Sequence, residues 1–204
     1  MAEISAGLVK QLREQTGAGM MECKKALVEA KGELGEAAVL LRKWGLASAG
    51  KKSSRSTKQG VIGTYIHAGA QMGVLVEVNC ESDFVARTDD FTELVRDLAM
   101  HVAASDPRYV RREDVPAAVV EVEKEIQKAR VINEGKPEKV AEKIVEGRIS
   151  KYFEEICLLE QPFVKENTIT IDQLIKGKIA KLGENITVAR FARFKVGETA
   201  SAAE

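Results

Sequence analysis

The sequence has no excess of either charge and no long apolar segment. Its 31 lysines and arginines balance 31 aspartates and glutamates, so no global field favours binding to nucleic acid or to an anionic membrane. No apolar run approaches the roughly 20 residues that a membrane-spanning helix needs. The N-terminal residues alternate polar and apolar side chains at helical spacing and lack the apolar centre of a signal peptide. These absences predict a cytoplasmic protein with no membrane partner and no direct nucleic-acid partner.

Cysteine and histidine are scarce. The three cysteines lie far apart, so they form neither a CxxC zinc motif nor a disulfide framework. One metal site stays open as an alternative, built from both histidines, one cysteine and one aspartate: His67, His101, Cys80 and Asp83. No spacing requires such a site. Buried thiols and packed imidazoles are the favoured interpretation, and we expect neither a metal nor a cofactor.

Common enzyme motifs are missing as well. No GxxxxGK[ST] phosphate loop, HExxH zinc motif or GxSxG nucleophile elbow occurs. "GAGMME" at Gly17–Glu22 imitates a dinucleotide fingerprint, but it lies between two expected helices and lacks the third glycine. "DFVARTDD" at Asp83–Asp90 lacks the glycine and the closing glutamate of a calcium loop. We therefore expect that the protein is not an enzyme.

The first 48 residues carry the apolar spacing of three short helices. Residues 16–19, "TGAG", and the glycine at position 32 are turn signals between them. The apolar stripes are Ile4, Leu8 and Leu12; Met20, Cys23, Leu27 and Ala30; and Leu34, Ala37, Ala38 and Leu41. Residues 1–48 are therefore predicted to close around one small core.

Residues 49–60, "AGKKSSRSTKQG", have almost nothing to bury. They are predicted to be a linker or a poorly packed helical extension. The segment contains four cations, Lys51, Lys52, Arg55 and Lys58. A nucleic-acid patch is the alternative, although no aromatic side chain lies among these cations.

Beyond residue 60 the apolar period changes to that of strands. Val61–His67 and Gly73–Asn79 are predicted to form a hairpin, with the valines at 74, 76 and 78 on one face. A third strand is expected at Ile186–Val196. Its two phenylalanines, at 191 and 194, have opposite parity, so either a bulge intervenes or both faces are covered, one of them by a second subunit. Helices are predicted from residue 91 to 102, capped by Thr88 or Asp89, and at 116–133, 137–156 and 170–182. The fold class is therefore α+β.

Phe84 is unusual because it lies among acidic residues in "NCESDFVARTDDF". One interpretation is a hydrophobic contact that pins a loop, with Ser82 or Asp83 capping the turn that follows. The other is an aromatic side chain aimed at another molecule.

Three motifs together resemble bacterial translation elongation factor Ts, the guanine-nucleotide exchange factor for elongation factor Tu. They are "TGAGMMECKKAL" at Thr16–Leu27, "NCESDFVAR" at Asn79–Arg87 and "LLEQPFV" at Leu158–Val164. They occur in the family's order, and the resemblance covers essentially the whole chain. Ser82 stands where the family usually has threonine, which keeps the hydroxyl group.

The resemblance implies a three-helix domain like the ubiquitin-associated (UBA) domain at residues 1–48, a linker at 49–60 and a core, dimerisation domain at 61–204. The core is expected to hold an antiparallel three-stranded sheet packed with helices. The chain is shorter than family members with two core subdomains and a protruding coiled coil. As a short form it is expected to pair through its sheet into a homodimer, giving a 2:2 complex with elongation factor Tu.

The resemblance also implies the site residues. Four residues around the aromatic are expected to displace Mg²⁺ in the partner and promote GDP release: Ser82, Asp83, Phe84 and Val85. Three residues of the helical domain are expected to contact the partner's G domain: Arg13, Met20 and Met21. Helical periodicity puts Met20 on the buried stripe and Met21 outward. Two rival interpretations are an RNA- or ribosome-binding helper using Lys51–Lys58, and a metalloenzyme using Asp83 with a histidine.

Overall fold

A computed structural model describes residues 4–135 and 137–198 and has an α+β fold. It divides into two compact units. One contains residues up to 62, 77–95 and 173–188, and the other contains 63–76, 96–172 and 189 onward. The ends of the predicted domains, residues 1–3 and 199–204, lie outside the described residues, and the predicted domain boundaries stay a prediction.

The N-terminal part of the first unit is a three-helix domain made of α1 (Ala6–Thr16), α2 (Met20–Glu29) and α3 (Leu34–Lys52). The turn between α1 and α2 passes through Gly17, whose φ of 68° favours glycine, and the Gly17 amide bonds to the last turn of α1. The helices bury a common core, which consists of Val9, Leu12, Cys23, Ala26, Leu27, Ala30, Ala37 and Leu41. The predicted stripes are thus confirmed except at Met20, and the arrangement fits a UBA-like domain.

The basic segment after this domain is partly helical. α3 continues to Lys52, with Ala49 buried, and β1 begins at Gln59. The helical extension that the sequence allowed is therefore present. Arg55 forms an ion pair with Glu81 over 3.4 Å.

The sheet has the strand order β1–β2–β5, with β1 at Gln59–Ile66, β2 at Met72–Cys80 and β5 at Ile186–Lys195. The β1–β2 hairpin closes with a bond from the His67 amide to the Met72 carbonyl. The Val196 amide, directly after β5, donates to the Gln71 carbonyl, directly before β2. The end of β5 thus lies beside the start of β2, so the two neighbouring strands run antiparallel. The predicted inward face of β2 is confirmed, since its alternate residues are buried: Val74, Val76, Val78 and Cys80.

Gly60 shows why one strand position requires glycine. Its φ is 149°, and a Cβ atom there would lie 2.3 Å from the Val78 carbonyl oxygen.

The burial pattern along β5 changes between its start and its two phenylalanines, Phe191 and Phe194, which have opposite parity. Ile186 and Val188 are buried, two exposed residues follow, and partial burial resumes at Phe191. The inward face thus shifts by one residue, as a bulge would produce. Phe194 is left 63% exposed.

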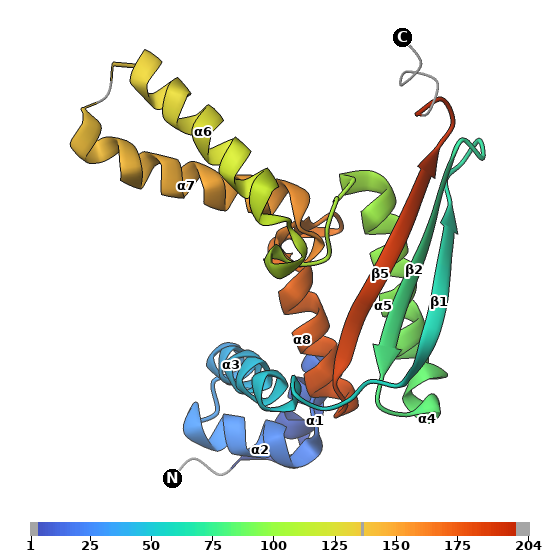
Figure 1. Cartoon of the computed structure of the whole chain (residues 1–204). Helices are drawn as coiled ribbons and strands as arrows, with labels where there is room; N and C mark the ends of the chain where they lie inside the picture. Colours follow the sequence, from blue (N-terminus) through green and yellow to red (C-terminus); the bar gives the residue numbers. More distant parts are fainter. Residues whose placement is uncertain (1–3, 136, 199–204) are drawn as a thin grey trace. The chain divides into compact units, whose positions relative to one another are not determined.

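The predicted helix after β2 is confirmed as α5 (Asp89–Ser105), which runs alongside the sheet (Figure 1). Thr88 is its cap, because its Oγ1 accepts a hydrogen bond from the Phe91 amide at 3.3 Å. The apolar stripe of α5 is buried: Phe91, Leu94, Val95, Leu98 and Val102. The predicted helix at 170–182 is α8 (Ile171–Leu182), which ends before Gly183.

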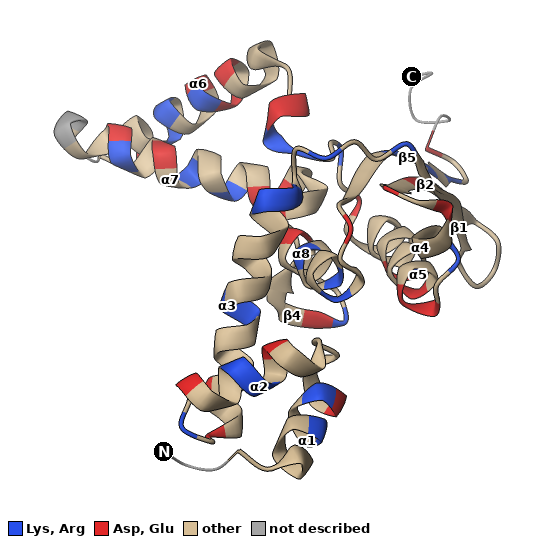
Figure 2. Cartoon of the chain, turned by 90° about the horizontal axis from the view of Figure 1, so that it is seen from below, with Lys and Arg blue, Asp and Glu red and all other residues tan. Residues whose placement is uncertain are grey.

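The second unit contains a helical hairpin, α6 (Ala117–Asn133) and α7 (Glu138–Ile156), where both helices were predicted. Its apolar seam includes Val131, Val145 and Ile149. Figure 2 shows acidic and basic residues interspersed along both helices. Part of the predicted break between them, residue 136, lies outside the described residues. The sequence did not predict the short pair β3 (Pro162–Phe163) and β4 (Glu166–Thr170).

Across residues 4–135 and 137–198, no helix combines the length and the apolar character needed to cross a membrane.

Candidate functional site

The centre of the candidate site is one helical turn, α4 (Asp83–Ala86), directly after β2. Ser82 precedes it in extended conformation and caps it, since its Oγ accepts a hydrogen bond from the Val85 amide at 3.3 Å. Val85 and Ala86 are buried and anchor the turn. Because neighbouring positions on a helix are about 100° apart, this anchoring turns Phe84 away from the core.

Phe84 is 76% exposed, the largest exposed fraction of any phenylalanine among the described residues. A buried phenylalanine side chain contributes about 1.5–3 kcal/mol that an exposed one does not. The interpretation that Phe84 pins the loop by packing is therefore wrong, whereas the capping role proposed for Ser82 is confirmed.

Asp83 forms an ion pair with Arg87, one helical turn later, over 2.9 Å. Both side chains are mostly in solvent, 66% and 79% exposed. Exposed pairs of this kind contribute about 0–1 kcal/mol, so either partner can exchange the contact for another at little cost.

The alternative metal site is not assembled. Within the described ranges no group of three or more histidine, cysteine or acidic side chains is placed to hold an ion. His67 bonds to the Tyr65 hydroxyl at 3.0 Å, and His101 bonds to the Gln161 side chain at 3.0 Å. The Cys80 thiol donates to the Ser82 carbonyl at 3.1 Å. Burial, followed by the nearby Glu184 carboxylate, raises the pKa of the Cys80 thiol, which suits a packed thiol rather than a ligand or nucleophile.

A residue that the sequence analysis missed, Glu184, holds Ser82. Its carboxylate accepts hydrogen bonds from the Ser82 amide at 3.0 Å and from the Ser82 hydroxyl at 2.6 Å. The acidic residue follows the glycine that ends α8, but no local pattern connects it with a loop 102 positions away. Only the fold brings the two together.

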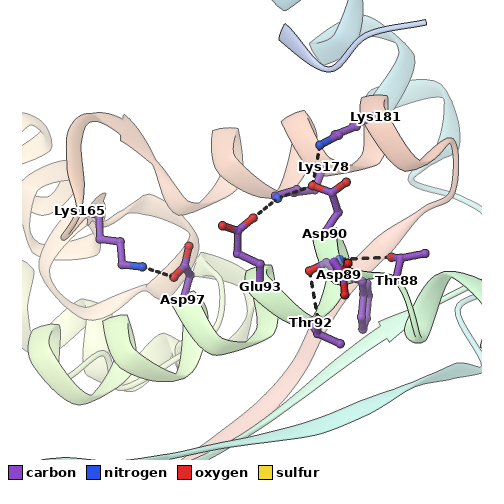
Figure 3. A network of polar contacts seen from close by, with 10 residues as sticks. Thr88, Asp89, Asp90, Thr92, Glu93, Asp97, Lys165, Lys178 and Lys181 are labelled. Carbon is purple, nitrogen blue, oxygen red and sulfur yellow. Dashed lines mark hydrogen bonds and ion pairs between the residues drawn. The ribbon is translucent and has the colours of Figure 1, made fainter. Parts of the chain in front are cut away.

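A second polar network joins α5 and α8 beside this turn (Figure 3). Lys178 and Lys181 of α8 both donate to the Asp90 carboxylate, at 3.0 and 2.7 Å, and Lys178 also pairs with Glu93 at 2.8 Å. The hydrogen bond from Lys181 is the main cause that lowers the pKa of Asp90. Farther along α5, Asp97 pairs with Lys165 at 2.6 Å. The start of α5, which follows the Phe84 turn, is thus tied to α8.

The candidate residues of the helical domain lie on exposed surfaces of α1 and α2. Arg13 is exposed on the last turn of α1, and Met21 is 76% exposed. The prediction that Met20 lies on the buried stripe is wrong, because it is 47% exposed. α2 begins at Met20, and side chains in a helix lean toward its N-terminus. Met20 therefore projects past the end of the core that Cys23 and Leu27 enter.

All seven predicted site residues belong to the first unit. The exposed apolar side chains among these seven residues form two groups. One is Phe84 on its capped turn, and the other is the methionine pair at the start of α2, each with a charged residue on the same or a neighbouring helix. This arrangement has the character of a contact surface for another protein, in which exposed aromatic and methionine side chains are typical anchors.

Comparison with known proteins gives a consistent result. The family model described as "Elongation factor TS" matches residues 3–200. A protein named Elongation factor Ts from Solibacter usitatus is 73% identical over 97% of this chain and 93% of its own length. Proteins of the same name from Koribacter versatilis and Heliobacterium modesticaldum are 62% and 58% identical, each over 96% of this chain and about nine-tenths of their own lengths.

Proposed function

Because this chain belongs to the elongation factor Ts family, which supports a role in translation elongation, we propose that it is the guanine-nucleotide exchange factor for elongation factor Tu. It binds elongation factor Tu with GDP bound, disturbs the Mg²⁺ and phosphate site, and promotes GDP release so that GTP can bind. It makes and breaks no covalent bond, so it is not an enzyme. It acts in the cytoplasm, without a metal or cofactor of its own.

The observation that carries this proposal is the exposure of Phe84 on a turn whose flanking residues are fixed. Ser82 caps the turn, Val85 anchors it, and the aromatic ring stays 76% in solvent. Burying that ring in a pocket of the partner supplies about 1.5–3 kcal/mol. This free energy is available to offset the loss of contacts between the partner and its nucleotide.

The partner's Mg²⁺ is a sensitive target for such an intrusion. Mg²⁺ demands near-octahedral oxygen ligands at about 2.0–2.1 Å, so a small displacement of its ligands weakens its binding. Loss of the ion leaves the GDP phosphates without their counter-charge. Asp83 lies beside the ring and adds negative charge there once its weak pair with Arg87 is released.

The methionines and Arg13 supply the second contact with the G domain. Methionine is flexible and polarizable, which suits an adaptable apolar interface. Since Met20 and Met21 are both exposed in the free chain, they can make this contact without opening the helical core.

A homodimer is proposed through the outward face of the sheet in the second unit. Ile66, Leu75, Phe194 and Val196 are all exposed there and surround one shallow apolar hollow. Contiguous exposed apolar side chains of this kind favour association. Two copies joined face to face would give a 2:2 complex with elongation factor Tu.

The test is release of a fluorescent GDP from elongation factor Tu, followed by stopped flow. Wild type is expected to accelerate release, and Phe84→Ala is expected to lose about 10- to 100-fold of that acceleration. The matched control is Ile132→Ala, which truncates an exposed apolar side chain on a different helix, α6. No acceleration by wild type would refute the exchange function. Equal acceleration by wild type and Phe84→Ala would support the exchange function and show that Phe84 does not cause it.

A further inference from the structure

Two of the three residues between α8 and β5, Glu184 and Asn185, form hydrogen bonds with Ser82 and Glu81, the residues directly before the Phe84 turn. The Glu184 carboxylate accepts from both the amide and the hydroxyl of Ser82, at 3.0 and 2.6 Å. Because the hydroxyl hydrogen points to Glu184, a lone pair of the same oxygen faces the Val85 amide, to which it bonds at 3.3 Å. Glu184 thus orients the cap as well as fixing its position.

The neighbouring residue makes the reciprocal contact. The Asn185 amide donates to the Glu81 carboxylate at 2.6 Å. The Asn185 side chain donates to the backbone carbonyls of Ser53 and Arg55, at 3.3 and 2.9 Å, and is only 2% exposed as a residue. The Arg55 guanidinium returns to the same Glu81 oxygen at 3.4 Å. One two-residue segment therefore bonds to the Phe84 turn and to the segment between α3 and β1.

We infer that Glu184 and Asn185 are positioning residues that hold the Phe84 turn and the segment after α3 in one fixed arrangement before the partner docks. This inference rests on the proposed function, in which Phe84 and the methionines of α2 meet the same partner. Ordering a loop on binding reduces affinity, and a segment ordered beforehand avoids that loss. Hydrogen bonds to an ionised carboxylate are stronger than neutral ones, which suits a contact that must not open.

The first test compares Glu184→Ala and Glu184→Gln in the GDP-release assay. The alanine variant is expected to lose about tenfold in kcat/KM for release. The glutamine variant retains an acceptor oxygen for Ser82 and is expected to recover part of the loss. Glu142→Ala, an exposed glutamate on α7, is the matched control and is expected to behave as wild type.

A double-mutant cycle distinguishes positioning from a general loss of stability. If Glu184 acts through Phe84, adding Glu184→Ala to Phe84→Ala is expected to change release by less than about twofold, because coupled residues are not additive. Full additivity of the two losses would overturn the inference.

Hydrogen exchange and proteolysis test the contacts in the free protein, independently of exchange activity. Glu184→Ala is expected to speed exchange at the Ser82 and Val85 amides by at least about tenfold while the Cys23 amide in α2 keeps its protection. Asn185→Ala is expected to speed trypsin cleavage after Lys52 and Arg55.

Glu81→Gln, which weakens the bonds of Glu81 to the Asn185 amide and to Arg55 without removing a buried side chain, is the second variant in case Asn185→Ala does not fold. Unchanged amide exchange at Ser82 and Val85, with unchanged cleavage in folded variants, would overturn the inference. If wild type fails to release GDP, the proposed function fails, and the exchange and cleavage measurements still decide whether these residues hold the turn.

Discussion

Two phenylalanines in adjacent helices are expected to respond to the same substitution in opposite ways. Phe84 on α4 is 76% exposed, whereas Phe91 on α5 is fully buried. Phe84→Ala removes a side chain that is mostly in water, so the free energy of unfolding is expected to change by less than about 0.5 kcal/mol. Phe91→Ala removes a core ring and leaves a cavity, so a loss of about 3–5 kcal/mol is expected.

The assay is urea unfolding monitored by circular dichroism, paired with GDP release at a temperature where both variants are folded. Phe84→Ala should keep the wild-type unfolding midpoint and lose release. Phe91→Ala should lower the midpoint and affect release only in proportion to the unfolded fraction. A destabilisation of more than about 2 kcal/mol by Phe84→Ala would mean that the ring packs in the free protein, which would refute its assignment as an outward contact.

Three further predictions concern other parts of the chain. Burial lowers the pKa of His101 below its ordinary 6.5, so the histidine of the unfolded chain is protonated more readily than that of the folded chain. Stability is therefore expected to fall as the pH drops below about 6.5. Urea titrations at pH 7.5 and 5.5 should show this loss, and the loss should be smaller for His101→Gln. Burial raises the pKa of Cys157 to about 11, so iodoacetamide at pH 8 should modify it far more slowly in the native protein than in urea, and equal rates would contradict its burial. Phe194→Asp should shift sedimentation from dimer to monomer, whereas a wild-type monomer at micromolar concentration would refute the proposed sheet interface.

Much of the fold follows from local patterns. The alternating valines of β2 predicted a half-buried strand, and the stripe after Thr88 predicted α5 with its cap, because both depend on periodicity and side chains close in sequence. The first residues of α6 and α7 follow from the prolines directly before them. β3 and β4 were missed because two- and five-residue strands are too short to show a period.

The candidate site was less predictable, for two reasons. Met20 fits the helical stripe but lies at the first position of α2, where periodicity does not tell whether the core extends so far. Glu184 and Asn185 contact residues more than 100 positions away, and no local pattern encodes such a contact. Phe84 was identified through the resemblance of its motif, since composition alone favoured a packed ring.

An exchange factor and GDP oppose each other on elongation factor Tu, so the affinity of this chain for its partner should depend on whether GDP is bound. Titration calorimetry would measure the Kd of this chain for elongation factor Tu without nucleotide and with saturating GDP. Because coupling is reciprocal, GDP is expected to weaken binding of this chain by the same factor by which this chain weakens binding of GDP, with each tenfold equal to about 1.4 kcal/mol. Equal affinity in both states, or tighter binding with GDP, would refute the proposed exchange function.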